Sequence, residues 1–180
     1  MRVLGIDPGS RVAGYGIVEE RGGILVPVAW GVVKPPPAKE LHPRLKYLFE
    51  AYAEIMIEYL PDEVAVENVF FAENARSALM LGHARAAAFM PALLQNIPFN
   101  EYTALQVKKA LVGAGHAGKG QVAAMVCRLL NMKEIPKPED VTDALAVAVT
   151  HLHNAPMRRK LALVKEAAPS ARHIRRGVRG

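Results

Sequence analysis

Two acidic residues stand at the ends of short apolar runs, where their side chains could do chemistry at the edge of a sheet. Asp7 follows the run at residues 3–6 (VLGI), and Glu67 follows the run at residues 64–66 (VAV). Neither run alternates between apolar and polar residues, so each predicts a strand that is buried on both faces. The turn pair at residues 8–9 (PG) ends the first strand. An acid before such a turn is often only a turn residue, so Asp7 alone does not indicate catalysis.

Two more acids, Asp140 and Asp143, stand at the start of a helix predicted at residues 141–153. Three residues advance about 300° around a helix, so the two side chains share one face. A purely structural explanation exists, in which Asp140 caps the helix and the helix dipole stabilises Asp143 in the first turn. That explanation does not account for the acids at the two strand ends as well.

Four carboxylates that converge without basic partners nearby in the sequence repel one another strongly in a low-dielectric cleft. A divalent cation would offset this repulsion, and oxygen ligands favour Mg²⁺ or Mn²⁺ over zinc. Two such ions about 3.5–4 Å apart can activate a water on one side of a phosphate and stabilise the leaving oxygen on the other. The acids therefore indicate metal-dependent phosphodiester hydrolysis. No Ser-His-Asp or Cys-His arrangement competes with this interpretation.

The spacing of apolar residues and turn signals predicts the elements that position these acids. Strands are expected at residues 13–20 and 24–34, joined at the Gly22-Gly23 hairpin, with Pro27 at an edge or a bulge. The remaining predictions are helices at 43–60, 75–95, 104–112 and 121–130 and a strand at 98–102, with Asn74 and Thr103 as caps and Pro91 as a kink or an end. This order predicts an α/β fold with a five-stranded mixed sheet flanked by helices, in which the strands ending in Asp7 and Glu67 are parallel and adjacent. Ligand sites in open α/β sheets lie beyond such strand ends.

Composition and charge favour one globular domain followed by a basic tail. The 180 residues are 51% hydrophobic, which suffices for a single core. Residues 156–180 hold eight Lys or Arg against one Glu, whereas the rest of the chain is nearly balanced. We therefore expect a nuclease domain at 1–155 and a flexible tail at 156–180, which either binds nucleic acid or is only a solvated terminus. With the single cysteine Cys127 and no evident signal peptide or membrane span, we expect a cytoplasmic protein without membrane association.

Beyond these patterns, the sequence resembles the RuvC-type Holliday-junction resolvases of bacteria. Five segments carry the likeness in the order and spacing of that family: GIDPGSRVAGYG at 5–16, VENVF at 66–70, NARSALMLGHARA at 74–86, QVKKALVGAGHAGK at 106–119 and DALAVAVTH at 143–151. The resemblance implies a ribonuclease-H-like fold and a crossover junction endodeoxyribonuclease of DNA recombination and repair. Such an enzyme makes paired, symmetric nicks in two opposed strands of a four-way DNA junction. Its expected cofactor is Mg²⁺, two ions per site, with Mn²⁺ able to substitute.

The resemblance also implies roles for individual residues. The catalytic and metal-binding acids would be Asp7, Glu67, Asp140 and Asp143. Phe70 matches the aromatic residue that reaches into the junction and stacks on a base, and Lys108 and Lys119 match basic residues near the scissile phosphate. Arg76 belongs to the local basic patches on which DNA binding would depend, because the body of the chain carries no net positive charge. Without the resemblance, Phe70 would be a core residue and the lysines ordinary surface residues.

The expected partners are a second copy of the chain and the branch-migration complex of RuvA and RuvB. The homodimer would form through the helix at 75–95, which is apolar on more than one face. Pro91 is expected to alter the dimer angle, and Glu139 offers a rival metal ligand beside Asp140.

Three other functions remain open from the sequence alone. The chain could be a related ribonuclease-H-like nuclease that acts on RNA, or a junction-binding scaffold without catalysis. The loop after Asp7 could also be the phosphate-binding turn of a sugar-kinase or actin-like ATPase, although that fold needs two such domains and this chain has one.

Overall fold

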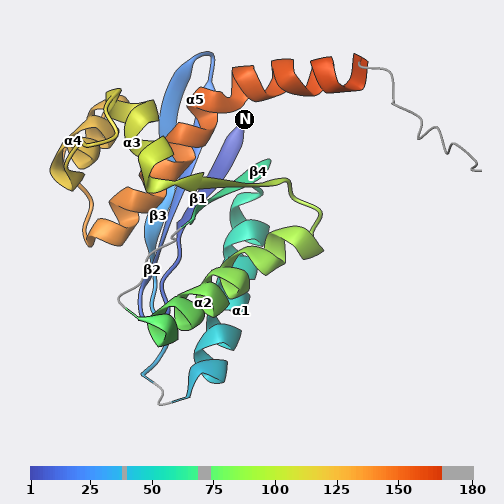
Figure 1. The fold of residues 1–180 in the computed structure, drawn as a ribbon, viewed down its shortest axis with the longest axis vertical. Coiled ribbons are helices and arrows are strands. Elements are labelled where there is room, and N and C mark those ends of the chain that lie inside the picture. The colour runs from blue at the N-terminus through green and yellow to red at the C-terminus, as the bar shows by residue number, and fades with distance from the viewer. Residues whose placement is uncertain (38–39, 69–73, 168–180) are drawn as a thin grey trace, which may run out of the picture.

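A mixed sheet with the strand order β3-β2-β1-β4-β5 forms the centre of the molecule. The computed structural model describes residues 1–37, 40–68 and 74–167 (Figure 1). The strands are β1 (Arg2–Asp7), β2 (Ala13–Arg21), β3 (Ile24–Val33), β4 (Glu63–Asn68) and β5 (Phe99–Thr103). The helices are α1 (Leu41–Tyr59), α2 (Ala75–Leu94), α3 (Ala104–Val112), α4 (Lys119–Leu129) and α5 (Glu139–Ala167).

The first three strands form an antiparallel meander, and β4 and β5 return parallel to β1 through helical crossovers. Gly22 and Gly23 make the hairpin between β2 and β3 in left-handed backbone conformations that glycine adopts without strain. Pro27 lies on the edge strand β3, where the pairing with β2 shifts between Ile17 and Val18. The predicted mixed sheet, its edge proline and the parallel pairing of β1 with β4 are therefore confirmed.

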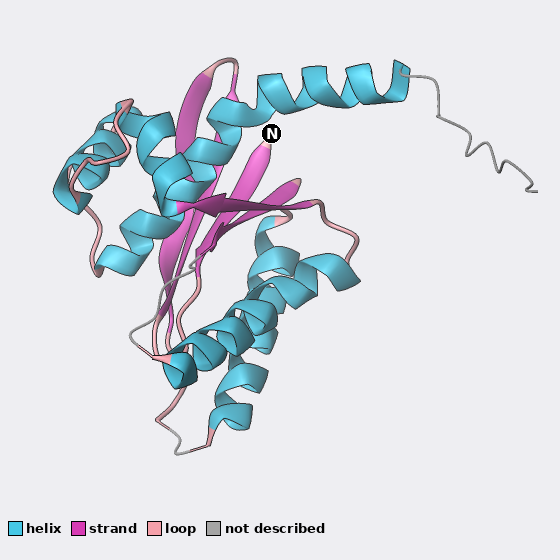
Figure 2. Ribbon diagram, in the orientation of Figure 1, coloured by secondary structure: helices cyan, strands magenta, loops and turns pink. Residues whose placement is uncertain are grey.

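Helices cover both faces of the sheet, and each face has its own apolar core (Figure 2). Leu4 and Ile6 of β1 point to the core beneath α1 and α2, whereas Val3 points to the core beneath α3, α4 and α5. Because alternate residues of a strand face opposite sides, Gly5 and Asp7 lie on the same face as Val3. The last residue of β1 therefore faces α5.

Four helix ends lie two or more residues from the predicted positions: the starts of α1, α4 and α5 and the end of α5. α1 begins at Leu41, since Pro43 is tolerated in a first turn, and α4 begins at Lys119. α2 ends at Leu94, within one residue of the predicted end, and Pro91 does not end it, because a proline near the end of a helix removes only one backbone hydrogen bond and the Pro91 carbonyl still accepts one from Gln95. α5 runs to Ala167 instead of ending at residue 153, and its last part extends away from the sheet (Figure 1).

A buried polar cluster holds α5 together across Pro156. The fully buried His151 places Nε2 2.7 Å from a Glu63 carboxylate oxygen and Nδ1 3.0 Å from the Tyr102 hydroxyl. Arg158 donates hydrogen bonds to the Tyr102 hydroxyl, the His151 carbonyl and Glu63. Burial, and then the nearby Arg158 charge, lower the pKa of His151 to about 4. These contacts fix the helical turn after Pro156, so α5 continues beyond the proline. The division into a domain at 1–155 and a tail at 156–180 stays a prediction.

α2 is long and apolar enough, by length and composition alone, to cross a membrane, and about 22% of its most apolar window is buried. Its Ala84, Ala88 and Ala92 nevertheless pack into the core beneath the sheet. Arg85, in the middle of the helix, pairs with Glu101 on β5. These contacts fit a helix that covers a sheet and exposes its outer face.

Glycines let the backbone of α5 approach the sheet closely. A Cβ atom on Gly5 would clash with the Ala144 carbonyl oxygen, and one on Gly14 would clash with the Asp140 carbonyl oxygen. A Cβ atom on Gly16 would overlap the Leu145 side chain. The first turns of α5 can therefore pack directly against β1 and β2.

We predict that Gly5→Ala destabilises the protein by about 1–3 kcal/mol, since the new methyl group meets backbone that cannot move without displacing α5. The free energy of unfolding from urea denaturation measures this loss. Gly120→Ala is the matched control, because a Cβ atom there meets nothing and alanine favours the helix. Equal stability of Gly5→Ala and the native chain would contradict the close packing.

Candidate active site

Asp7 and Glu67 end two neighbouring parallel strands and face the same side of the sheet. The register pairs Ile6 of β1 with Val66 of β4, so the acid that follows each lies at the next position along its strand. Both acids face α5, because they alternate with Leu4 and Ile6 and with Val64 and Val66, which point into the opposite core. The sequence-based expectation of two adjacent strand-end acids is met by this register.

α5 brings the other two acids to this end of the sheet. The helix begins at Glu139, so Asp140 is a helical residue rather than its cap. Asp140 lies with its backbone against Gly14, and Gly14 pairs with Asp7 across the β1–β2 ladder. Asp143 follows one helical turn later on the same face.

A cavity of about 300 Å³ joins three of the four acids. Asp7, Glu67 and Asp143 line it together with Lys108 of α3 and Lys119 of α4; Ala104, Val107, Val122 and Ala146 complete its wall. We call it the acidic cavity. Asp140 is not among its lining residues, although its charge is close enough to act on Asp7. The structure thus gathers five of the residues predicted from the sequence around one space.

Burial and mutual repulsion make these acids difficult to ionise. Burial, followed by the charges of Glu67, Asp143 and Asp140, raises the pKa of Asp7 to about 8, and Lys119 opposes that rise. The pKa of Glu67 is raised by burial and by Asp143. Burial also raises the pKa of Asp143, against the lowering effect of Lys119. A site that gathers buried carboxylates at this cost in stability is typical of functional chemistry.

Lys119 partly balances the negative charge. Its ammonium nitrogen lies 3.5 Å from Asp143 and 3.4 Å from Glu139, and the Asp143 charge is the main cause of its raised pKa. Glu139, the rival ligand considered from the sequence, is exposed and faces this lysine. It does not line the acidic cavity.

The donor set fits a hard divalent cation. Across residues 1–37, 40–68 and 74–167, no three His, Cys, Asp or Glu side chains are already close enough together to hold a metal ion. The acids that share the cavity are nevertheless all carboxylates, which are the ligands that Mg²⁺ and Mn²⁺ prefer. A cation there would remove the repulsion that raises the pKa of Asp7. Asp7, Glu67 and Asp143 are the residues of this cavity that would hold it.

Side chains of α1 hold the loop after Asp7 and the start of β2 from the other face of the sheet. The buried Arg44 donates hydrogen bonds from Nε (2.9 Å) and Nη2 to the Ser10 carbonyl. The hydroxyl of the fully buried Tyr52 donates to the Gly14 carbonyl at 3.0 Å. The sequence did not single out these two residues, because both appear only as members of an amphipathic helix. The signal that could have indicated Arg44 is its position in the first turn of that helix.

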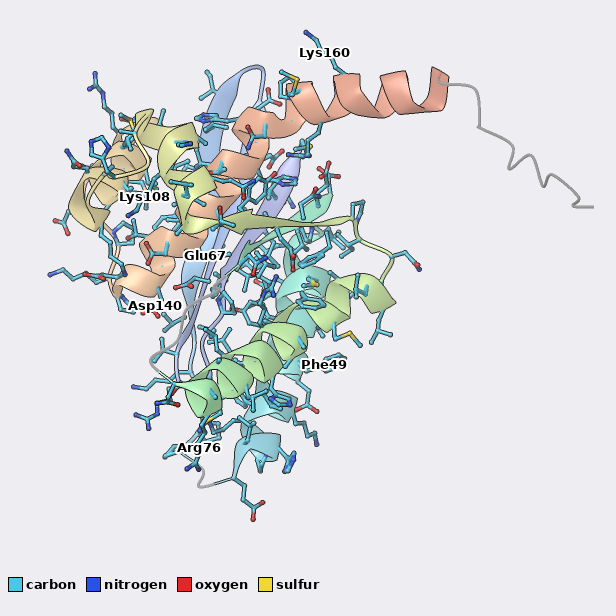
Figure 3. The ribbon with its side chains drawn as sticks, viewed as in Figure 1. Phe49, Glu67, Arg76, Lys108, Asp140 and Lys160 are labelled. Atoms are coloured by element: carbon cyan, nitrogen blue, oxygen red, sulfur yellow. The ribbon has the colours of Figure 1, made fainter. Side chains whose placement is uncertain are left out.

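The remaining predicted residues lie in different places. Phe70 falls outside the residues that the structure describes. Arg76 is exposed in the first turn of α2 and lines a separate cavity. In the view of Figure 3, Lys108 lies above Glu67 and Asp140, and Arg76 lies below them.

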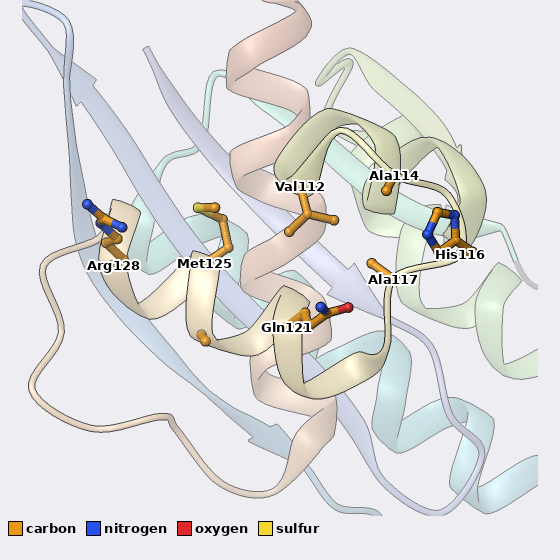
Figure 4. Close-up of a pocket in the computed structure, with 8 residues that line it drawn as sticks. Val112, Ala114, His116, Ala117, Gln121, Met125 and Arg128 are labelled. Atoms are coloured by element: carbon orange, nitrogen blue, oxygen red, sulfur yellow. The ribbon is translucent and has the colours of Figure 1, made fainter.

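A further cavity lies between α3, α4 and the loop that joins them, with a volume of about 420 Å³ (Figure 4). Its walls are mainly apolar, with His116, Gln121 and Arg128 as the polar side chains. No acid is among the described residues that line it, so it lacks the groups needed for metal-dependent hydrolysis.

Comparison with known proteins identifies the family. The model of the family described as crossover junction endodeoxyribonuclease RuvC matches residues 3–151. The chain belongs to the RuvC family of crossover junction endodeoxyribonucleases. It is 52% identical over 165 residues to the RuvC of Geobacter metallireducens, covering 92% of this chain and all of that protein. The RuvC of Pelobacter propionicus is 53% identical over 154 residues, covering 86% of this chain and 87% of that protein.

Solved structures agree with the RuvC assignment and with a ribonuclease-H-like α/β fold. The Thermus thermophilus RuvC structure has a TM-score of 0.80 at 37% identity, covering 88% of this chain and 97% of that one. The same enzyme in complex with a Holliday junction substrate has a TM-score of 0.83 and covers 88% of this chain and 96% of that one. The yeast mitochondrial Holliday junction resolvase Ydc2, at 13% identity and a TM-score of 0.66, shares the fold. RuvC nucleases depend on divalent metal, in keeping with the acidic cavity.

We predict that Asp7→Asn stabilises the metal-free protein, by an amount that grows between about pH 5 and pH 8. The folded state raises the pKa of Asp7 to about 8, so the native carboxyl resists ionising while the unfolded one ionises readily, and the native chain loses stability as the pH rises through this window. Asparagine carries no charge and escapes that loss. Unfolding midpoints in the presence of a chelator measure the difference.

Glu134→Gln, at an exposed position outside the acidic cavity, controls for the loss of one negative charge. An Asp7→Asn stability gain that is the same at both ends of the pH window would contradict the raised pKa of Asp7.

Proposed function

We propose that this RuvC-family chain resolves Holliday junctions by hydrolysing one phosphodiester bond at each acidic cavity. The observation that carries the proposal is the convergence of Asp7, Glu67 and Asp143 from two strand ends and a helix into one cavity, with Asp140 beside it. The junction substrate follows from family membership and from the Thermus thermophilus RuvC complex with a Holliday junction, which shares the fold at 37% identity.

The cofactor we propose is Mg²⁺, two ions per site, with Mn²⁺ able to substitute. Asp7, Glu67, Asp140 and Asp143 would hold them, and the ions supply an activated water and stabilise the leaving oxygen. In this hydrolysis the water oxygen would form a bond to phosphorus as the bond to the leaving oxygen breaks, with the proton of the water passing to solvent and the leaving oxygen taking up a proton from solvent. The buried walls of the cavity strengthen these electrostatic effects, because fewer water molecules screen them.

Basic side chains bind the substrate around the acids. Lys108 and Lys119 line the acidic cavity and would contact the scissile phosphate, since both already act on the carboxylates there. Phe70 would stack on a base of the junction, a role that comes from the family motif. Arg76 would contact the DNA backbone beyond the cut.

We propose a homodimer formed through α2. The helix exposes Leu79, Met90, Leu93 and Leu94 on its outer face, which is an unusual density of apolar side chains for a monomer surface. A two-fold dimer presents two identical sites to a junction that has pseudo-two-fold symmetry of its own, so paired, symmetric nicks follow. The branch-migration proteins RuvA and RuvB are the further partners we propose. We also propose a cytoplasmic location, which the DNA substrate supports.

The decisive experiment offers the purified protein and Mg²⁺ a four-way DNA junction, a linear duplex and an RNA–DNA hybrid. We expect symmetric nicks in the junction alone. Asp7→Asn should bind the junction at least as tightly as the native chain, since it loses a ligand and no phosphate contact, and its cleavage rate should fall at least about 100-fold.

Each other outcome contradicts part of this proposal. Cleavage of the hybrid in preference to the junction would indicate an RNA nuclease. Tight junction binding without cleavage by the native chain would indicate a scaffold. Full activity of Asp7→Asn would refute the role of that residue.

We predict that Leu79→Asp breaks the dimer. Leu79 is 66% exposed on α2, so the substitution changes the proposed interface without disturbing the core. Ile24→Asp, at a 68% exposed position on β3, is the matched control. Sedimentation equilibrium should show a monomer for the first variant and a dimer for the second; a dimer in both would place the interface elsewhere.

A further inference from the structure

A second charged cavity lies at the same end of the sheet as the acidic cavity, on the side of α1 and α2. It has a volume of about 960 Å³, and its charged lining residues are Arg11, Lys34, Arg44 and Arg76. Pro35, Pro36, Pro37, Asn74, Ser77 and Met80 complete its lining. We call it the basic cavity, since no acid is among the described residues that line it.

The four cations of the basic cavity have no carboxylate partners in the described part of the chain. Other cations do: Arg85 pairs with Glu101, Arg158 with Glu63, and Lys119 with Asp143. None of the four takes part in an ion pair among the described residues. Like charges lining one concave surface raise the local potential and attract an anion.

Arg44 makes the basic cavity a built site rather than a chance cluster of surface charges. It is only 8% exposed, and two of its nitrogens are fixed by the Ser10 carbonyl. Among the described residues no carboxylate pairs with its charge, which costs stability until an anion binds there. Because Ser10 follows Asp7 by three residues, an anion that binds Arg44 also lies against the loop that carries a catalytic acid.

The position of the basic cavity fits the path of a nucleic-acid strand. Arg11 lies in the loop after β1, and Arg76 lies in the first turn of the helix after β4, so both follow the strands that carry Asp7 and Glu67. Lys108 lines the acidic cavity from α3, and Arg76 lies on the other side of Glu67 in Figure 3. A strand whose phosphate enters the acidic cavity would meet cations on both sides of the cut.

We propose that the basic cavity binds backbone phosphates of the cleaved DNA strand, on the side of the scissile phosphate opposite Lys108 and Lys119. This inference rests on the proposed junction substrate. The volume of the cavity exceeds that needed for one phosphate ion, and its walls of prolines and long aliphatic stems accept a sugar–phosphate backbone without reading bases. The site therefore adds affinity for DNA of any sequence.

The test compares two double variants that lose the same charge. Arg11→Gln/Lys34→Gln changes exposed residues of the basic cavity and leaves Arg44 in place to hold the loop. Lys46→Gln/Lys133→Gln changes two exposed lysines that do not line it. Binding of a synthetic four-way junction is measured in a chelator, so that no cleavage occurs.

We expect the first variant to bind about tenfold or more weakly, with the slope of log affinity against log salt reduced by about 1–2, and the control to match the native chain. Junctions with single uncharged methylphosphonate linkages then locate the phosphates that the basic cavity binds. A linkage that weakens junction binding by the native chain should not weaken binding by the first variant any further. Equal binding by both double variants would overturn the inference.

Two further outcomes separate the inference from the function on which it rests. If inorganic phosphate at millimolar concentration competes with the junction for the native chain but long duplex DNA does not, the basic cavity is a small-anion site and the inference is wrong. If the native chain binds the junction through the basic cavity but never cleaves it, the proposed function fails, while the binding of DNA phosphates by the basic cavity stands.

Discussion

The close packing of α5 against β1 and β2 is the constraint on which the rest of the structure depends. Gly5 and Gly14 carry no side chain where α5 crosses them, so the helix backbone comes close to the strand backbone there, and Gly16 leaves room for the Leu145 side chain. The apolar side chains of α5, among them Leu145 and Val149, then complete one of the two cores. This packing sets the first turn of the helix beside the end of β1, and Asp140 and Asp143 reach Asp7 as a consequence.

That arrangement places buried like charges together, which works against folding. The raised pKa values of Asp7, Glu67 and Asp143 express this opposition, and Lys119 relieves only part of it. The surrounding structure fixes the chain after Asp7 from both faces: α5 packs on one side, and on the other Arg44 of α1 bonds the Ser10 carbonyl of the loop while Tyr52 bonds the Gly14 carbonyl of β2. A divalent cation bound to these carboxylates would offset the repulsion between them, so the same repulsion would favour metal binding.

Much of this could be predicted from the sequence, because the relevant signals are local or periodic. The non-alternating runs before Asp7 and Glu67 predicted buried parallel strands, and the caps Asn74 and Thr103 predicted helix starts that the structure confirms. The limits of the helices were harder. α5 passes Pro156 because Arg158 contacts residues from β4 and β5, and no local pattern reveals such contacts.

In the candidate site, too, some residues could be predicted from local sequence signals and others depend on the fold. The acids could be identified from their spacing and from the family motifs, whereas Arg44 and Tyr52 looked like ordinary members of an amphipathic helix until the fold placed them under the loop of Asp7. The basic cavity could not be predicted from the sequence either, because its lining residues come from a loop, the end of an edge strand and two helices. The tail beyond residue 167 and Phe70 lie outside the described residues, so their predicted roles stay predictions.

The most direct measurement of the central claim is the anomalous scattering of Mn²⁺ in crystals of the native protein soaked with the metal. We predict a peak within coordination distance of carboxylate oxygens of Asp7, Glu67 and Asp143, with the Lys119 ammonium displaced from its position beside Asp143. A peak elsewhere on the molecule, or an acidic cavity that stays without metal at saturating Mn²⁺ while Lys119 keeps its place, would contradict the account.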